Sequence, residues 1–180
     1  MKRFHIILFI VLINSVLGNH MIAQKGGGDY RRKGVFLEIL GNGLLATVNY
    51  DMRFNKNRQD GLGFRVGIGG LSVNGTDNAG LSVNAGILTI PFEINYLSGK
   101  RRSAFEAGLG LTPLFISAKI KLDDEKFGGS GSGTNGFLSL GYRYQPINKG
   151  FLFRINWTPI INSYGISPAW FGISFGFSFR

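Results

Sequence analysis

Few residues in this sequence have side chains suited to nucleophilic or acid–base catalysis. The chain has no cysteine, and its two histidines, His5 and His20, lie close to the N-terminus. Glu93 and Glu106 remain as a carboxylate pair that neighbouring strands would bring together. Hydrolytic dyads and triads need a nucleophile activated by a base, usually histidine. We therefore expect no enzymatic activity and interpret the two glutamates as parts of a structural charge network.

Two glycine-rich stretches resemble phosphate-binding loops only superficially. Neither "GLGFRVGIGG" nor "GGSGSGTNG" opens a predicted helix, and the second lacks the Gly-Lys-Ser/Thr ending of a phosphate loop. We expect the first to line a packed strand and the second to form a flexible loop tip. The sequence thus predicts no cofactor and no metal site.

The N-terminus has the composition of a secretory signal peptide. Met1, Lys2 and Arg3 form a short basic segment, followed by the apolar run "FHIILFIVLINSVLG". An N-terminal membrane helix is the alternative, but it needs about 20 apolar residues and this run is shorter. We expect a signal peptide over residues 1–23, cleaved after Gly18 or Ala23, and a flexible periplasmic segment over residues 24–34.

The rest of the chain, residues 35–180, alternates between apolar and small or polar side chains with a period of two, which is typical of β-strands. Eight such stretches are separated by turn residues: 35–40, 44–54, 62–69, 88–96, 105–115, 138–145, 151–161 and 171–179. The sequence "LSVN" occurs at 71–74 and 81–84, and we interpret it as two arms of a hairpin. Because a meander of this kind hides its edges by closing, we predict an all-β, eight-stranded antiparallel up-and-down barrel.

The distribution of charge on these strands indicates which face meets lipid. All their charged residues share the face of the glycines and serines: Glu38, Asp51, Arg53, Arg65, Glu93, Glu106, Arg143 and Arg154. A soluble barrel would carry lysine and mixed charge outside, whereas a lipid-facing surface excludes charge at about 2–4 kcal/mol per Arg or Lys near mid-bilayer. We therefore expect a transmembrane barrel whose lumen holds these eight residues as a mutually paired, structural network.

With these features the chain resembles the small eight-stranded outer-membrane β-barrel family of Gram-negative bacteria, of the OmpX and OmpA membrane-domain type. The resemblance rests on the strand pattern and on the terminal "GISFGFSF", although the chain ends with Arg180 after Phe179. It implies that the C-terminal strand is recognised by the outer-membrane assembly machinery.

The expected role is structural, or surface recognition and adhesion through external loops whose ligand is unknown. A narrow channel for small solutes and, with less support, a lipid-modifying enzyme are the alternatives. Net charge is +10, but eleven of the sixteen basic residues outside the eight strand stretches lie in the turns "NKNRQD", "LSGKRR" and "QPINKG", in residues 24–34 or at Arg180. We expect these turns and both termini in the periplasm, close to anionic lipids, so that outer-membrane lipids are partners and nucleic acid is not.

Overall fold

The computed structural model describes residues 31–76, 81–99, 101–122 and 125–180 of the 180-residue chain. The predicted signal peptide and residues 24–30 of the predicted periplasmic segment lie outside the described residues. Residues 31–34, which we expected in that flexible segment, instead begin the first strand. Within the described ranges, no helix is both long enough and apolar enough to cross a membrane.

The described chain forms one antiparallel sheet with eleven strands rather than the eight predicted. The elements are β1 (Arg31–Leu40), the 3-10 turn η1 (Gly41–Gly43), β2 (Ala46–Lys56), β3 (Gly61–Thr76), β4 (Ser82–Thr89), β5 (Phe92–Ser98), β6 (Ser103–Leu122), β7 (Glu125–Tyr144), β8 (Gly150–Trp157), β9 (Ile160–Asn162), β10 (Gly165–Ser167) and β11 (Phe171–Phe179). The additional strands arise near prolines. Pro91 separates β4 from β5, Pro159 separates β8 from β9, and Pro168 lies between β10 and β11, because proline has no N–H to donate to a ladder.

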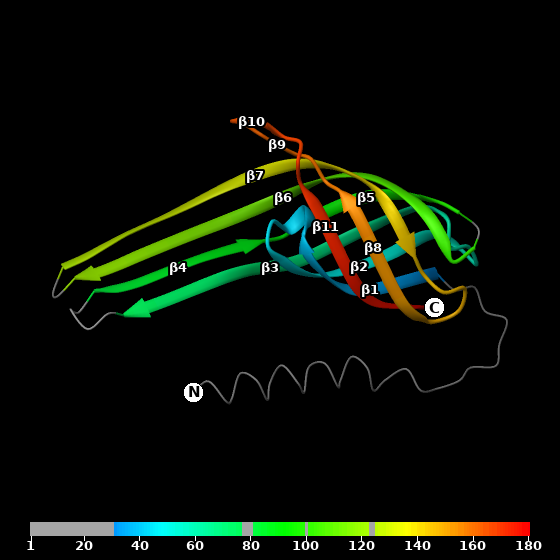
Figure 1. Ribbon diagram of the computed structural model, residues 1–180, viewed down its shortest axis with the longest axis horizontal. Helices are drawn as coiled ribbons and strands as arrows, with labels where there is room; N and C mark the ends of the chain where they lie inside the picture. Colours follow the sequence, from blue (N-terminus) through cyan, green and yellow to red (C-terminus); the bar gives the residue numbers. More distant parts are fainter. Residues whose placement is uncertain (1–30, 77–80, 100, 123–124) are drawn as a thin grey trace.

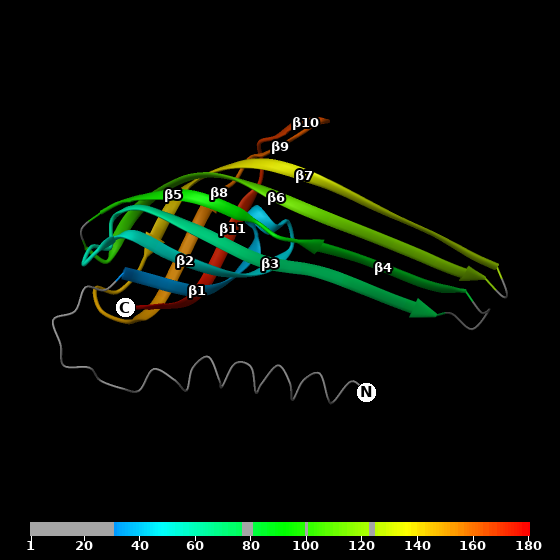
Figure 2. The same ribbon diagram turned by 180° about the vertical axis from the view of Figure 1, so that it is seen from behind.

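The pairing follows chain order, as in a meander (Figures 1 and 2). β3 and β6 each pair with both β4 and β5, so these two short strands occupy one position in the sheet. β7 pairs with β6 on one side and with β8 and β9 on the other, and β8 pairs with β11. β1 pairs with β2 and also with β11, so the first and last strands are neighbours.

The two faces of the sheet differ in polarity. The inner face carries the buried polar and charged side chains, and the outer face carries exposed large apolar ones. On β11, Phe171, Phe175 and Phe177 are exposed on the outer face, whereas Ser174 and Ser178 are buried on the inner face. This arrangement is the reverse of a soluble protein's.

Four strands continue past their neighbours and form a long projection (Figure 1). Beyond Gly70 the pairing of β3 is with β4 alone, and before Gly136 the pairing of β7 is with β6 alone. We call the paired segments 71–76, 82–87, 114–121 and 127–135 the extension.

Our expectation that "GGSGSGTNG" is a flexible loop tip was wrong, because this stretch is a regular part of β7. The facing segment of β6, residues 111–119, is mostly apolar or β-branched, and its ladder with β7 satisfies the backbone despite the glycines.

Candidate functional site

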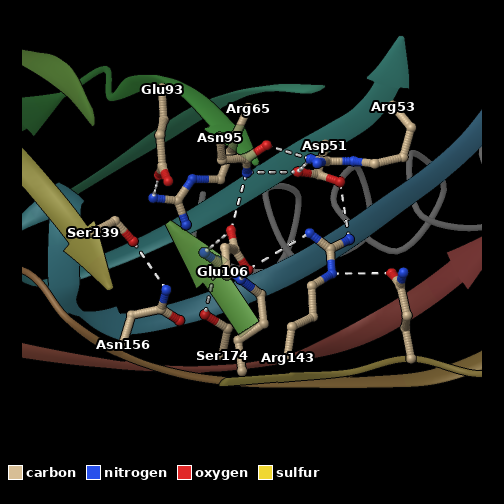
Figure 3. A network of polar contacts seen from close by, with 12 residues as sticks. Asp51, Arg53, Arg65, Glu93, Asn95, Glu106, Ser139, Arg143, Asn156 and Ser174 are labelled. Carbon is tan, nitrogen blue, oxygen red and sulfur yellow. Dashed lines mark hydrogen bonds and ion pairs between the residues drawn. The ribbon is translucent and has the colours of Figure 1, made fainter. Parts of the chain in front are cut away.

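The inner face brings all eight predicted charged residues together in one buried cluster. Figure 3 labels Asp51, Arg53, Arg65, Glu93, Glu106 and Arg143 among them. Each has a relative exposure of 3% or less. They come from β1, β2, β3, β5, β6, β7 and β8, and their positions follow from the strand period, because every one lies on the same side of the pleat. Ion pairs join the eight into one path of alternating sign: Arg53, Asp51, Arg143, Glu106, Arg154, Glu38, Arg65 and Glu93.

One half of this path surrounds Asp51. Arg53 Nη2 lies 2.6 Å from Asp51 Oδ2, and Arg143 Nη2 lies 2.9 Å from Asp51 Oδ1. Asn95 Nδ2 donates to Asp51 Oδ2 at 3.1 Å and to Glu106 Oε1 at 3.0 Å, while its Oδ1 accepts from Arg53. Asn95 therefore bridges two carboxylates that would otherwise repel each other. The eight-residue prediction did not include this asparagine, although it lies on the inner face of the predicted fourth strand.

The other half is held by Arg154. Its Nε and Nη2 donate to the two oxygens of Glu106 at 2.9 and 2.7 Å, which is a bidentate pair. Its Nη1 lies 3.7 Å from Glu38 Oε1, and its guanidinium carbon lies 4.7 Å from the ring centroid of Phe36. Arg65 continues the path by contacting both Glu38, at 3.2 Å, and Glu93.

The interior is closed at the base of the extension by η1. Gly41, Asn42 and Gly43, which connect β1 to β2, are all buried. Asn42 Nδ2 donates to Glu93 Oε2 at 2.7 Å, and the Asn42 carbonyl accepts from Thr112 Oγ1 at 2.7 Å. Trp170 Nε1 donates to the Gly41 carbonyl at 2.8 Å. The turn therefore folds inward because residues from distant parts of the chain form hydrogen bonds with its polar groups. No local feature of the sequence indicates this inward position.

The opposite end of the interior is filled by Arg32, Gln59 and Gln145. Arg32 is 2% exposed and donates to the carbonyls of Ile147 and Asn148. Gln59 Nε2 donates to the Arg101 carbonyl at 2.6 Å, and Gln145 Nε2 donates to the Gln59 carbonyl at 3.3 Å. The sequence did not indicate a buried role for Arg32, because we expected residues 24–34 to form a flexible segment.

The two candidate catalytic carboxylates have different partners. The structure does not pair Glu93 with Glu106: Arg65 and Asn42 hold the first, and Arg154 and Asn95 hold the second. In the described part of the chain, no group of three or more His, Cys, Asp or Glu residues is placed to hold a metal ion.

No known family model matches the chain, and no curated protein matches it. Solved structures do match in shape. A major outer membrane protein of Thermus thermophilus matches with a TM-score of 0.54 at 10% identity, over 83% of this chain and 99% of that one. Ail of Yersinia pestis, solved in complex with the heparin analogue sucrose octasulfate, matches with a TM-score of 0.51 at 11% identity, over 84% of this chain and 97% of that one.

The N-terminal β-barrel domain of Pseudomonas aeruginosa OprF has a TM-score of 0.47 at 14% identity, over 83% of this chain and 96% of that domain. The first two matches and the reversed polarity of the sheet together indicate the fold. The chain has the fold of the small outer-membrane β-barrel proteins.

Proposed function

We propose that this chain is an eight-stranded outer-membrane barrel with a structural, side-chain-filled lumen and an extension used for surface recognition. The pairings support eight spans if β4 and β5 form one interrupted strand and β9 and β10 form a hairpin that joins β8 to β11. The pairing of β1 with β11 would then close these eight spans into a barrel.

The observation that carries the proposal is the polarity of the two faces. Leu62, Leu109 and Phe177 on the outer face are 50%, 64% and 60% exposed, whereas the charges of the inner face are buried and paired. Water does not favour an exposed apolar surface of this extent, but hydrocarbon does. A hydrocarbon environment for the outer face therefore explains both faces together.

Insertion into lipid tests this proposal. The chain without residues 1–23 is refolded from urea into phosphatidylcholine vesicles, and folding is followed by the faster gel migration of an unheated barrel and by protection from trypsin. We expect a heat-sensitive, protease-protected band. A chain that stays soluble and monomeric without lipid or detergent contradicts the proposal.

The orientation follows from the extension. We place it outside the cell, with both termini and the turns containing Arg58, Arg101 and Lys149 in the periplasm, as the basic turns suggest. The chain has no native cysteine, so single cysteines can be introduced cleanly. Ser132→Cys in the extension should react with a membrane-impermeant maleimide on intact cells, whereas Lys149→Cys should react only after the outer membrane is permeabilised. The opposite pattern inverts the orientation.

A recognition role for the extension is supported by its shape and exposure. Its side chains are exposed on both faces, and Leu71, Val73 and Phe127 are 55%, 57% and 60% exposed. Strands that project this far contribute nothing to closing the barrel, and exposed apolar residues of this kind mark interaction surfaces. The β11 ladder of Phe171, Phe175 and Phe177 supports, in addition, recognition of the C-terminal strand by the assembly machinery.

The two alternative functions have less support. A narrow channel requires a continuous water path, but the charge network, η1 and the Arg32 cluster fill the interior. A lipid-modifying enzyme requires a free acid or base, but both candidate carboxylates are engaged by arginine. The structural role of the network is therefore the interpretation that fits its geometry.

A further inference from the structure

The polarity of β6 reverses where the strand enters the extension. Up to Phe115, at the base of the extension, the outer face of β6 carries exposed apolar side chains, among them Leu109 and Leu111. Further along the same face come Ser117, Lys119 and Lys121. On the inner face the opposite change occurs, since the buried Glu106 and Thr112 are followed by the exposed Ile116 and Ile120.

The neighbouring strands show the same reversal. Asn84 and Ser82 of β4 pair with Lys119 and Lys121, and Gly128 of β7 pairs with Lys119 from the other side. On this outer face the described side chains are hydroxyls, amides and the two lysines, with no carboxylate among them. The lysines therefore lie directly beyond the apolar surface, on the side that faces lipid, and not on the side above the barrel mouth.

Two adjoining open grooves, of about 800 and 560 Å³, lie on this face and share Ser117 and Ser130. The first reaches down to Leu88 and Phe115, and the second contains both lysines. Glycines leave space in these grooves that side chains would otherwise occupy. A Cβ on Gly128 would lie 3.3 Å from Lys119 Cγ, and one on Gly86 would lie 3.5 Å from Ser117 Oγ.

We infer that this surface, which we call the lysine groove (Asn84, Ser117, Lys119, Lys121 and Ser130), binds the phosphate-bearing headgroup of an outer-leaflet lipid. The lysine ammonium groups supply positive charge, and the serine hydroxyls and the Asn84 amide supply further hydrogen-bond donors. The acyl chains of the same lipid lie against Leu88 and Phe115, at the lower end of the groove. A lipid fits better than a soluble anion because the charged and apolar parts are contiguous on one face.

This inference rests on the proposed function, because the groove meets a headgroup only if the outer face is embedded. The test uses the folded chain in uncharged maltoside micelles, with dihexanoyl phosphatidylglycerol added and backbone amide shifts followed by NMR. We expect the largest shifts at residues 117–121 and 128–130. Each of Lys119→Gln and Lys121→Gln should weaken binding about fivefold, and the double variant about thirtyfold, since one lysine near an anionic lipid surface has this effect.

A charge-matched control is Arg101→Gln with Lys149→Gln, which removes two exposed cations at the opposite end of the barrel. It should change the affinity less than twofold. Gel migration and the amide spectrum report whether each variant is folded. Phosphatidylglycerol shifts that are absent from the lysine groove, or unchanged in the double variant, overturn the inference while leaving a folded, inserted barrel. A chain that fails to enter phosphatidylcholine vesicles overturns the proposed function and this inference with it.

Two soluble probes separate the lipid from other anions. Glycerol phosphate carries the charge without acyl chains, and we expect it to bind at least tenfold more weakly than the lipid. Sucrose octasulfate, the heparin analogue bound to Ail, tests a sulfated glycan as the ligand. If either soluble anion binds the groove as tightly as phosphatidylglycerol, the site recognises a soluble polyanion and the lipid assignment is wrong.

Discussion

The bidentate pair of Arg154 and Glu106 gives the sharpest test of the buried network. Both side chains are fully buried, and two hydrogen bonds of 2.7 and 2.9 Å join them. Replacing Arg154 with Met removes the main partner of Glu106 and one partner of Glu38, and leaves uncompensated negative charge in the lumen. Breaking a buried pair in this way typically destabilises a protein by about 3–5 kcal/mol.

The reverse change, Glu106→Gln, leaves Arg154 with Glu38 at 3.7 Å, Ser174 Oγ at 3.4 Å and the Phe36 ring at 4.7 Å as contacts. We expect a similar loss of about 3–5 kcal/mol. The double variant removes one charge of each sign and keeps the lumen neutral, so its loss should be close to that of the hydrogen bonds alone, about 1–2 kcal/mol. The coupling energy between the two positions should then be about 3 kcal/mol or more.

The assay is equilibrium unfolding of the four proteins by urea in phosphatidylcholine vesicles, with tryptophan fluorescence and gel migration as probes of folding. Refolding from the unfolded state establishes that the transition is reversible. If either single variant loses less than about 1 kcal/mol, or if the double variant loses the sum of the two singles, the charges act independently. The continuous path inferred from the ion pairs would then be incorrect.

Further predictions follow from the packing, the turn and the lumen. Gly141→Ala should destabilise the barrel by about 2 kcal/mol or more, because the added Cβ would lie 2.1 Å from the Ile155 carbonyl oxygen. Gly129 lies on the same strand, and a Cβ there would have no atom within 4 Å. Gly129→Ala should therefore change the free energy of unfolding by less than about 0.5 kcal/mol in the same urea assay. Leu44→Gly should stabilise the protein by about 1 kcal/mol, because Leu44 has a φ of 73° that glycine adopts without strain. The control Leu45→Gly should destabilise the protein. A loss of stability on Leu44→Gly would show that the backbone at Leu44 is unstrained. In planar bilayers the folded chain should show no resolved conductance steps, and steady steps that change with Arg154→Met or Asn42→Ala would support a channel instead.

The strands and their faces follow largely from the sequence. A period of two fixes which side chains share a face, so Glu38, Arg65 and Arg154 could be assigned to one surface without knowing how the strands pair. The absence of charge on the other face indicated lipid. The extension was only partly predictable: the "LSVN" copies lie on the paired strands β3 and β4, apart from Leu81, but glycines suggested a loop where β7 is a strand.

The ion-pair partners and the inward turn were decided only by the tertiary structure. Arg154 and Glu38 are separated by 116 positions, and their contact depends on strand tilt and on the register of β8, β11 and β1. Asn42 is buried because Glu93, Thr112 and Trp170, all remote in sequence, place hydrogen-bonding groups around its turn. Local alternation determines only the side of a strand on which a residue lies, whereas the partner it meets depends on distances between strands that form when the whole sheet has curved.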